Sequence, residues 1–187
     1  MNKIRQSKGG TILLQCKFLL VEWLNMTYTL VPNPLRKWYL RCFGIKMGKA
    51  SCIHRRCKFF HIGNFIMGQN SYINWGCYLD NRRSISIGNN VGVAHNTKIY
   101  TLGHNVDSDY FEAKGAPVRI EDEVFIFSNV LIMPGVTIHR GAVILTGSVV
   151  TKDVPEWAVV GGNPARIIRI KERKLAFKRK YNYWFAL

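Results

Sequence analysis

The sequence predicts an all-β fold, a parallel β-helix of about five triangular coils, with a helical lead-in at the N-terminal end and a helix at the C-terminal end. Three observations lead to this prediction. Aliphatic residues recur at every sixth position over most of the chain, extra residues enter only after every third repeat, and helix-like spacing is confined to the first part of the chain.

The six-residue period is clearest between residues 120 and 154. One position of each repeat is wholly aliphatic, and it holds Ile120, Ile126, Ile132, Ile138, Ile144 and Val150. The position four places later is small or β-branched, and it holds Val124, Val130, Val136, Ala142, Ser148 and Val154. A 3.6-residue helical period does not produce this spacing, and neither does a two-residue strand period. Each repeat is therefore expected to turn one aliphatic side chain inward from a short, flat strand.

The same frame continues upstream in triplets. The inward positions are Met47, Ile53 and Phe59, then Met67, Ile73 and Leu79, then Ile87, Val93 and Ile99. The step is six residues within a triplet, eight between triplets, and 21 from Ile99 to Ile120. Three repeats therefore close one triangular coil, and coils stack at roughly 4.8 Å per turn. Because every insertion follows the third repeat of a coil, all the extra residues are expected to form loops at the same corner of the prism.

The two ends of the chain follow other patterns, which suggests three regions. Residues 1–44 form the helical lead-in, residues 45–160 the β-helix with a long loop at 101–117, and residues 161–187 a tail that ends in a basic helix. Helix-like spacing in the lead-in is carried by Leu13, Leu14, Phe18, Val21 and Leu24. Polar and charged residues interrupt this apolar stretch, so we expect a helix lying on a protein or bilayer surface rather than a membrane-spanning one.

Charge and cysteine content limit the possible functions less strictly than the repeat limits the fold. The chain has 27 Lys and Arg against 11 Asp and Glu, a net charge of +16, which predicts attraction to an anionic partner. Five cysteines without a CxxC pair argue against a disulfide framework or a zinc knuckle and fit a reducing cytosol. We therefore expect a cytoplasmic protein, and peripheral contact with the inner face of the membrane stays open as an alternative.

From about residue 33 to residue 170 the chain resembles the hexapeptide-repeat acetyltransferases. The stretch VLIMPGVTIHRGAVILTGSVVTKDVPEWAVVGGNPARIIRI is similar to the last coils of that family, and the lead-in NPLRKWYLRCFGIKMGKA resembles its exopolysaccharide-modifying members, such as those acting on colanic acid. Maltose, galactoside and nodulation-factor O-acetyltransferases are the other members it resembles. The resemblance implies a left-handed β-helix, an exception to the usual right-handed crossover. It also implies transfer of an acetyl group from acetyl-CoA to a hydroxyl.

Such a transfer needs a base, and a neutral imidazole suits that role because its pKa lies near working pH. His104, in the segment TLGHN where the long loop begins, stands where the family has its catalytic histidine. His54 and His139 follow inward residues and are expected to point outward, as structural or solvated side chains. His104 is therefore the predicted general base, and the loop at 101–117 is expected to shape the acceptor pocket.

The resemblance also implies the residues that bind the two substrates. Asn74 and Asp80 are expected to contact the acceptor. Acetyl-CoA, as co-substrate and with no metal required, is expected to lie along Ser128, Thr146, Thr151, Lys152, Arg166 and Arg169. In this assignment the backbone N–H of Ser128 faces the thioester and stabilises the oxyanion, and the two arginines meet the nucleotide phosphates through their planar guanidinium groups.

The family forms trimers with CoA between subunits, so the resemblance implies a homotrimer, a carbohydrate acceptor and no nucleic-acid partner. Two alternatives stay open. One is acetylation of another small acceptor, such as an amino sugar, serine or an antibiotic. The other is a non-enzymatic scaffold that binds polyanions through its basic charge. A γ-type carbonic anhydrase is disfavoured, because no two histidines have the required spacing of five residues.

Overall fold

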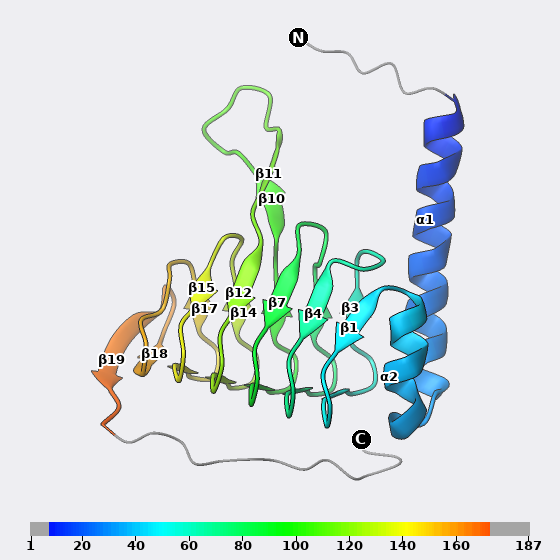
Figure 1. Cartoon of the computed structure of the whole chain (residues 1–187). Helices are drawn as coiled ribbons and strands as arrows, with labels where there is room; N and C mark the ends of the chain where they lie inside the picture. Colours follow the sequence, from blue (N-terminus) through cyan, green and yellow to red (C-terminus); the bar gives the residue numbers. More distant parts are fainter. Residues whose placement is uncertain (1–7, 173–187) are drawn as a thin grey trace.

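The computed structural model describes residues 8–172, and its body is a parallel β-helix with three sheets (Figure 1). The first sheet contains β1 (Ile45–Met47), β4 (Phe65–Met67), β7 (Ile85–Ile87), β12 (Val118–Ile120) and β15 (Thr137–Ile138). The second contains β2 (Cys52–Ile53), β5 (Tyr72–Ile73), β8 (Gly92–Val93), β13 (Phe125–Ile126), β16 (Val143–Ile144) and β18 (Ala158–Gly161). The third contains β3 (Lys58–Phe59), β6 (Tyr78–Leu79), β9 (Lys98–Ile99), β14 (Leu131–Ile132) and β17 (Val149–Val150). Successive strands of each sheet pair in parallel, so the chain completes five coils, as the repeat predicts.

The core confirms the six-residue period. All of the inward aliphatic positions from Met47 to Val150 are at most 5% exposed, and the second position of each repeat is equally buried from Val124 to Val154. The register pairs equivalent positions of neighbouring coils, for example Ile126 with Ile144. Each coil therefore buries its apolar edge against the coils above and below it, as expected for a repeat that is not stable alone.

The corners between the sheets differ in regularity. The corner between the second and third sheets is formed by residues 54–57, 74–77, 94–97, 127–130 and 145–148, and we call it the compact corner. The corner between the third and first sheets is formed by residues 60–64, 80–84, 100–117, 133–136 and 151–153, and we call it the expanded corner. All the insertions lie at the expanded corner. One of them carries an antiparallel hairpin of β10 (Leu102–His104) and β11 (Ala113–Gly115) that projects from the stack (Figure 1).

The helical lead-in consists of α1 (Lys8–Thr27), a 3-10 turn η1 (Tyr28–Leu30) and α2 (Asn33–Cys42). It covers the open end of the first coil and supplies the hydrogen bonds that a further coil would make. The Asn25 side chain bonds both the N–H and the carbonyl of Phe59 at 2.9 Å, and Arg36 donates to the carbonyl of Ile53 at 2.9 Å. These contacts protect edge strands that would otherwise be left unpaired.

This cover overturns one expectation. His54 is only 1% exposed rather than pointing to solvent, because the lead-in packs over the first coil. The Tyr28 hydroxyl, itself buried, donates to the carbonyls of His54 and Cys57 at 3.2 and 2.8 Å. His139, four coils away, does reach the surface and pairs with Glu121.

At the other end, β18 pairs antiparallel with β19 (Arg166–Ile170) through a turn with a cis peptide bond at Asn163–Pro164. The predicted basic helix falls mainly on residues 173–187, which lie outside the described part of the chain. Within residues 8–172, no helix combines the length and the apolar character that a bilayer crossing requires.

Candidate functional site

The first part of the site is the base of the hairpin at the expanded corner. His104 ends β10 and is exposed, and its Nδ1 lies 2.8 Å from the backbone carbonyl of Phe111. Because a carbonyl only accepts hydrogen bonds, Nδ1 must donate, which leaves Nε2 without a proton in the neutral ring. The Phe111 ring stacks on the imidazole at 4.8 Å with an angle of 5° between the planes. His104 is thus held in one orientation with an accepting nitrogen available.

A pocket of about 530 Å³ opens beside this histidine. Its lining residues come from both hairpin strands and from the next coil, and are Tyr100, Leu102, Gly103, His104, Lys114, Gly115, Ala116, Leu131, Met133 and Pro134. Glu112, from the same loop, does not line this pocket and bonds Asn105 and Ser108 within the hairpin tip. The pocket at His104 is therefore mostly apolar, with Lys114 as its second basic group.

Asp80 also lies at the expanded corner, but its position does not support the predicted contact with an acceptor. Its side chain is 0% exposed, and its two oxygens accept hydrogen bonds from Arg82 at 2.7 and 2.9 Å. The Thr101 hydroxyl donates to the Asp80 carbonyl at 2.6 Å. Burial alone would raise the pKa of Asp80, but the hydrogen bonds and charge of Arg82 outweigh it and hold that pKa below its ordinary value. Asp80 fixes the corner from which the hairpin leaves.

Thr151 and Lys152 follow β17 at the expanded corner, two coils beyond the hairpin, and both are exposed. Asp153, next in sequence, accepts the backbone N–H of Thr137 at 2.7 Å and so anchors this turn to the first sheet. The two predicted cofactor residues therefore share an edge of the prism with His104.

The remaining predicted residues lie at the compact corner, where one backbone position repeats from coil to coil. This column is Arg55, Trp75, His95, Ser128 and Thr146, and the carbonyls of its first four members accept N–H groups from the next coil at 2.9–3.3 Å. Asn74 precedes Trp75 and is half-buried, and no hydrogen bond of its side chain is recorded within residues 8–172. The Ser128 N–H likewise has no backbone partner in this part of the chain. It can donate to a ligand lying along the column.

Arg166 and Arg169 stand on β19, and both are exposed. Arg166 pairs with Gly161, where the second sheet reaches the compact corner, so it extends the column of Ser128 and Thr146. Arg169 pairs with Val159, towards the opposite end of the strand. Arg166 is therefore the better placed of the two for an anion lying along the compact corner.

The predicted site residues thus form two groups on different edges of the prism. His104, Thr151 and Lys152 belong to the expanded corner, whereas Asn74, Ser128, Thr146 and Arg166 belong to the compact corner. No compact-corner residue lines the described pocket at His104. One copy of the chain does not bring the two groups together.

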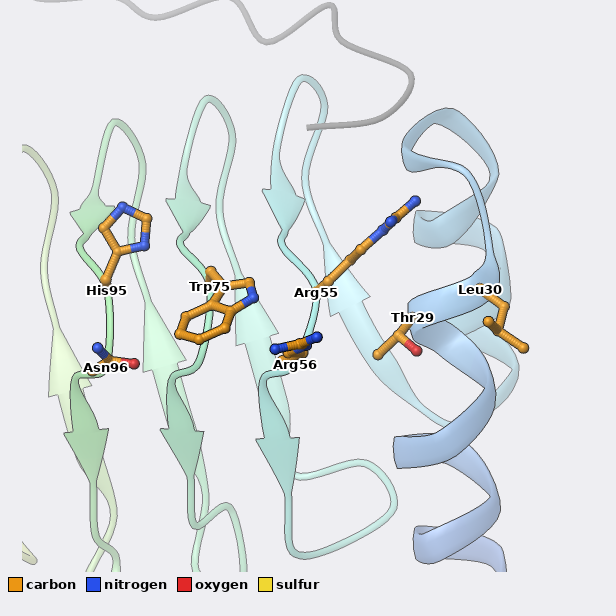
Figure 2. Close-up of a pocket in the computed structure, with 7 residues that line it drawn as sticks. All are labelled: Thr29, Leu30, Arg55, Arg56, Trp75, His95 and Asn96. Carbon is orange, nitrogen blue, oxygen red and sulfur yellow. The ribbon is translucent and has the colours of Figure 1, made fainter. Parts of the chain in front are cut away.

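Sequence reasoning missed a second pocket, of about 710 Å³, at the N-terminal end of the compact corner (Figure 2). Thr29, Leu30, Arg55, Arg56, Trp75, His95 and Asn96 line it. The signal that could have found it is the repeat itself, because Arg55, Trp75 and His95 occupy the same place in their coils as Ser128. Within residues 8–172, no three His, Cys, Asp or Glu side chains come together as metal ligands.

Comparison with known proteins supports the same architecture. Residues 117–152 match the family described as bacterial transferase hexapeptide (six repeats). The structure superimposes on a hexapeptide-repeat acetyltransferase from Vibrio cholerae complexed with acetyl-CoA, with a TM-score of 0.79 and 27% identity over 91% of this chain and 98% of the other. For a maltose O-acetyltransferase from Clostridium difficile, the TM-score is 0.76 and the identity 31%, over 86% of this chain and 89% of the other.

A sequence relative is the galactoside O-acetyltransferase of Escherichia coli, 35% identical over 126 residues, which are 66% of this chain and 62% of that protein. The chain spans 49% to 62% of the length of the first four curated relatives it matches. The solved structures, by contrast, are covered almost completely. The six-residue core, the five coils and these similarities together place the chain in the hexapeptide-repeat acetyltransferase family.

Proposed function

We propose that the protein is an acetyl-CoA-dependent O-acetyltransferase that acetylates a hydroxyl of a sugar or of a cell-surface polysaccharide precursor. The observation that carries the proposal is the geometry of His104. Its Nδ1–H is bound by the Phe111 carbonyl at 2.8 Å and its ring is stacked on Phe111, so Nε2 is presented as a proton acceptor beside a pocket. An oriented imidazole of this kind is the usual general base for a hydroxyl.

The reaction needs no covalent enzyme intermediate. The acceptor hydroxyl donates its proton to Nε2 of His104 while its oxygen forms a bond to the acetyl carbonyl carbon. The carbonyl oxygen becomes negatively charged and accepts the Ser128 N–H. The C–S bond then breaks, and the imidazolium returns its proton to the departing thiolate. The Phe111 carbonyl stabilises the imidazolium through its bond to Nδ1.

The compact corner offers the features that CoA requires. Ser128 and Thr146 follow one another in the column, so a pantetheine arm can run along the stack with successive turns as its floor. Arg166 lies at the C-terminal end of this column, where its guanidinium meets phosphate oxygens. We assign supporting phosphate contacts to Lys152 and Arg169, and a position beside the channel to Thr151.

We propose that a homotrimer completes the site. His104 and the CoA edge lie at different corners of one prism, so the hairpin of one copy must face the compact corner of the next. A closed ring of three heterologous contacts satisfies this requirement for all copies at once. Asn74, whose side chain makes no recorded hydrogen bond in the described chain, then faces the acceptor bound between the copies.

We also propose that α1 contacts an anionic membrane at its cytoplasmic face. Consecutive apolar residues are exposed on more than one side of this helix, including Leu13 (66%), Leu19 (71%) and Trp23 (60%), and its N-terminal half projects beyond the coils (Figure 1). Trp38 on α2 is exposed as well, and the guanidinium carbon of Arg41 lies 5.5 Å from the centre of its ring. Apolar side chains, interfacial tryptophans and a net charge of +16 together suit an anionic bilayer surface. We expect the protein to co-sediment with phosphatidylglycerol vesicles but not with phosphatidylcholine vesicles. The double variant Leu13→Ser/Leu19→Ser should no longer co-sediment with either.

The enzymatic proposal is tested by incubating the protein with acetyl-CoA and a panel of sugars and nucleotide sugars, and by following release of the free thiol. We expect acceptor-dependent release that requires His104. An absence of both CoA binding and thiol release across the panel would contradict the proposal.

A further inference from the structure

The pocket beside His104 lies between the base of the hairpin and the third sheet. On the side of the sheet, Tyr100 follows β9, Leu131 belongs to β14 and Met133 follows it. On the other side the lining comes from β10, from β11 and from Ala116, which follows β11. His104 is itself one of the lining residues, so a group held in the pocket lies beside the proposed base.

Small residues on the hairpin side leave this space open. Gly103, Gly115 and Ala116 all line the pocket. Apart from its chain neighbours, a Cβ added to Gly103 would have no atom closer than the Lys114 carbonyl oxygen at 4.0 Å, so the protein does not fill the space in front of it. The pocket volume of about 530 Å³ is within the range of small-molecule sites. It is far larger than the single methyl group of an acetyl thioester requires.

The lining of the pocket suits an alkyl group better than a sugar. Among residues 8–172, its polar side chains are those of Tyr100, His104 and Lys114. Lys114 is exposed, so its ammonium group can stay in water while its methylene groups face the pocket. The other side chains of the lining are apolar and belong to Leu102, Ala116, Leu131, Met133 and Pro134. A saccharide here would bury hydroxyl groups against side chains that cannot bond them, which is costly, whereas an alkyl group gains free energy on burial.

The proposed reaction leaves this pocket free for one part of the donor. The acceptor is assigned to Asn74 of the next copy, and the pantetheine arm to Ser128 and Thr146. The acyl carbon must come within bonding distance of the acceptor oxygen, whose proton passes to Nε2 of His104. The alkyl part of the acyl group therefore begins beside His104, next to an apolar space that neither the acceptor nor the pantetheine arm occupies.

We propose that this pocket holds the alkyl part of the acyl group, and that the enzyme transfers short-chain acyl groups longer than acetyl, such as butyryl and hexanoyl, from their CoA thioesters. The bonds change as in acetyl transfer. The acceptor oxygen bonds to the acyl carbon, the C–S bond breaks, and the hydroxyl proton passes through His104 to the CoA thiolate. The inference rests on the proposed transfer from a CoA thioester and names the class of donor that the site takes.

The test is calorimetric titration of the full chain with free CoA, acetyl-CoA, butyryl-CoA and hexanoyl-CoA, together with thiol release from the same thioesters. We expect binding to become about tenfold tighter with each added pair of methylene groups, as for their transfer from water to an apolar site.

Affinity that stays constant or falls with chain length would overturn the inference, and thiol release from acetyl-CoA that depends on His104 would then leave the acetyltransferase proposal standing. Competition by octyl β-glucoside without any dependence on acyl length would assign the pocket to an apolar acceptor, and would also overturn it. No binding of any of the four CoA compounds would contradict both proposals.

Two variants test the pocket itself. Ala116→Leu places a larger side chain in it and should remove the gain in affinity from acetyl-CoA to hexanoyl-CoA. Leu131→Ser makes the lining more polar and should reduce the same gain. Val149→Ser is its matched control, because Val149 is the register partner of Leu131 one coil further on and does not line the pocket. This control should keep the gain. A gain that is unchanged in both Ala116→Leu and Leu131→Ser would contradict the assignment of the pocket to the acyl group.

Discussion

The two corners of the prism that carry the candidate site residues are built from the same repeat but differ in shape. At the compact corner every coil turns in four residues, so equivalent positions lie directly above one another and form a continuous column from Arg55 to Thr146. At the expanded corner the turns vary in length, and one of them carries the hairpin with His104. The regular corner provides a long edge along which an extended ligand can lie, whereas the insertion at the other corner provides a single exposed histidine. The proposed reaction needs both, and one chain holds them apart.

The largest effect is expected from the expanded corner. His104→Ala removes the proposed base and should lower kcat by about 10²–10⁴-fold, the usual contribution of a positioned general base. Affinity for CoA should be unchanged, since His104 is not among the proposed CoA contacts. Turnover and CoA titration measured on the same preparation separate the two effects.

His139→Ala is the matched control for this substitution, because His139 is a half-exposed histidine on another corner, paired with Glu121. It should keep nearly full turnover. If His104→Ala were as active as this control, the base would have to be sought elsewhere.

Substitutions at the compact corner should weaken the binding of acetyl-CoA more than they slow the chemical step. Arg166→Gln removes a guanidinium at the end of the column and should raise the KM for acetyl-CoA by about 10–100-fold, corresponding to a charged hydrogen bond, with a smaller change in kcat. The same substitution should not affect a truncated thioester that lacks the nucleotide. A parallel loss with the truncated thioester would mean that Arg166 acts on the fold and not on the phosphates.

The smallest effect is expected in stability. Asp80→Asn weakens the bonds to Arg82 and should lower the free energy of unfolding by about 1–3 kcal/mol at neutral pH. Because the pKa of Asp80 is lowered in the folded state, its stabilising contribution is present above the ordinary carboxyl pKa of about 3.9 and is lost as pH falls through the folded value.

The two proteins should therefore converge in stability as the solution is acidified, which chemical denaturation at several pH values would follow. Glu112→Gln, which changes an exposed carboxylate at the hairpin tip, should show no comparable loss at neutral pH. If the difference in the free energy of unfolding between wild type and Asp80→Asn stayed constant down to strongly acidic pH, the role given to Asp80 would be contradicted.

The repeat made most of the fold predictable from sequence. A six-residue period whose insertions all follow every third repeat determines which side chains point inward, and every one of those side chains is buried. His54 was misjudged because the repeat describes a coil with neighbours on both sides, whereas the first coil has the lead-in as its neighbour. The packing of a helix onto the end of a stack depends on contacts between distant residues such as Asn25 and Phe59, which no local pattern reveals.

The candidate site was predictable in part. Local motifs made His104 the candidate base, but the orientation of its ring depends on Phe111, which the hairpin brings beside it from seven residues away. Asp80 looked available in sequence, yet its neighbour Arg82 turns back and binds it. Trp75, Arg55 and Arg56 were overlooked because their significance lies in the stacking of three coils at one corner, which becomes visible only when the register is known.

The most direct test of the account mixes two inactive variants, His104→Ala and Thr146→Trp, of which the second is designed to block the CoA edge. If each site combines the hairpin of one copy with the compact corner of the next, random mixed trimers should recover about one quarter of the wild-type sites, because one pairing in four is intact. Activity that appears on co-assembly at about this level is the predicted result. Mixtures that form hetero-trimers and stay as inactive as their parents would show that both groups act within one chain, and would contradict the account.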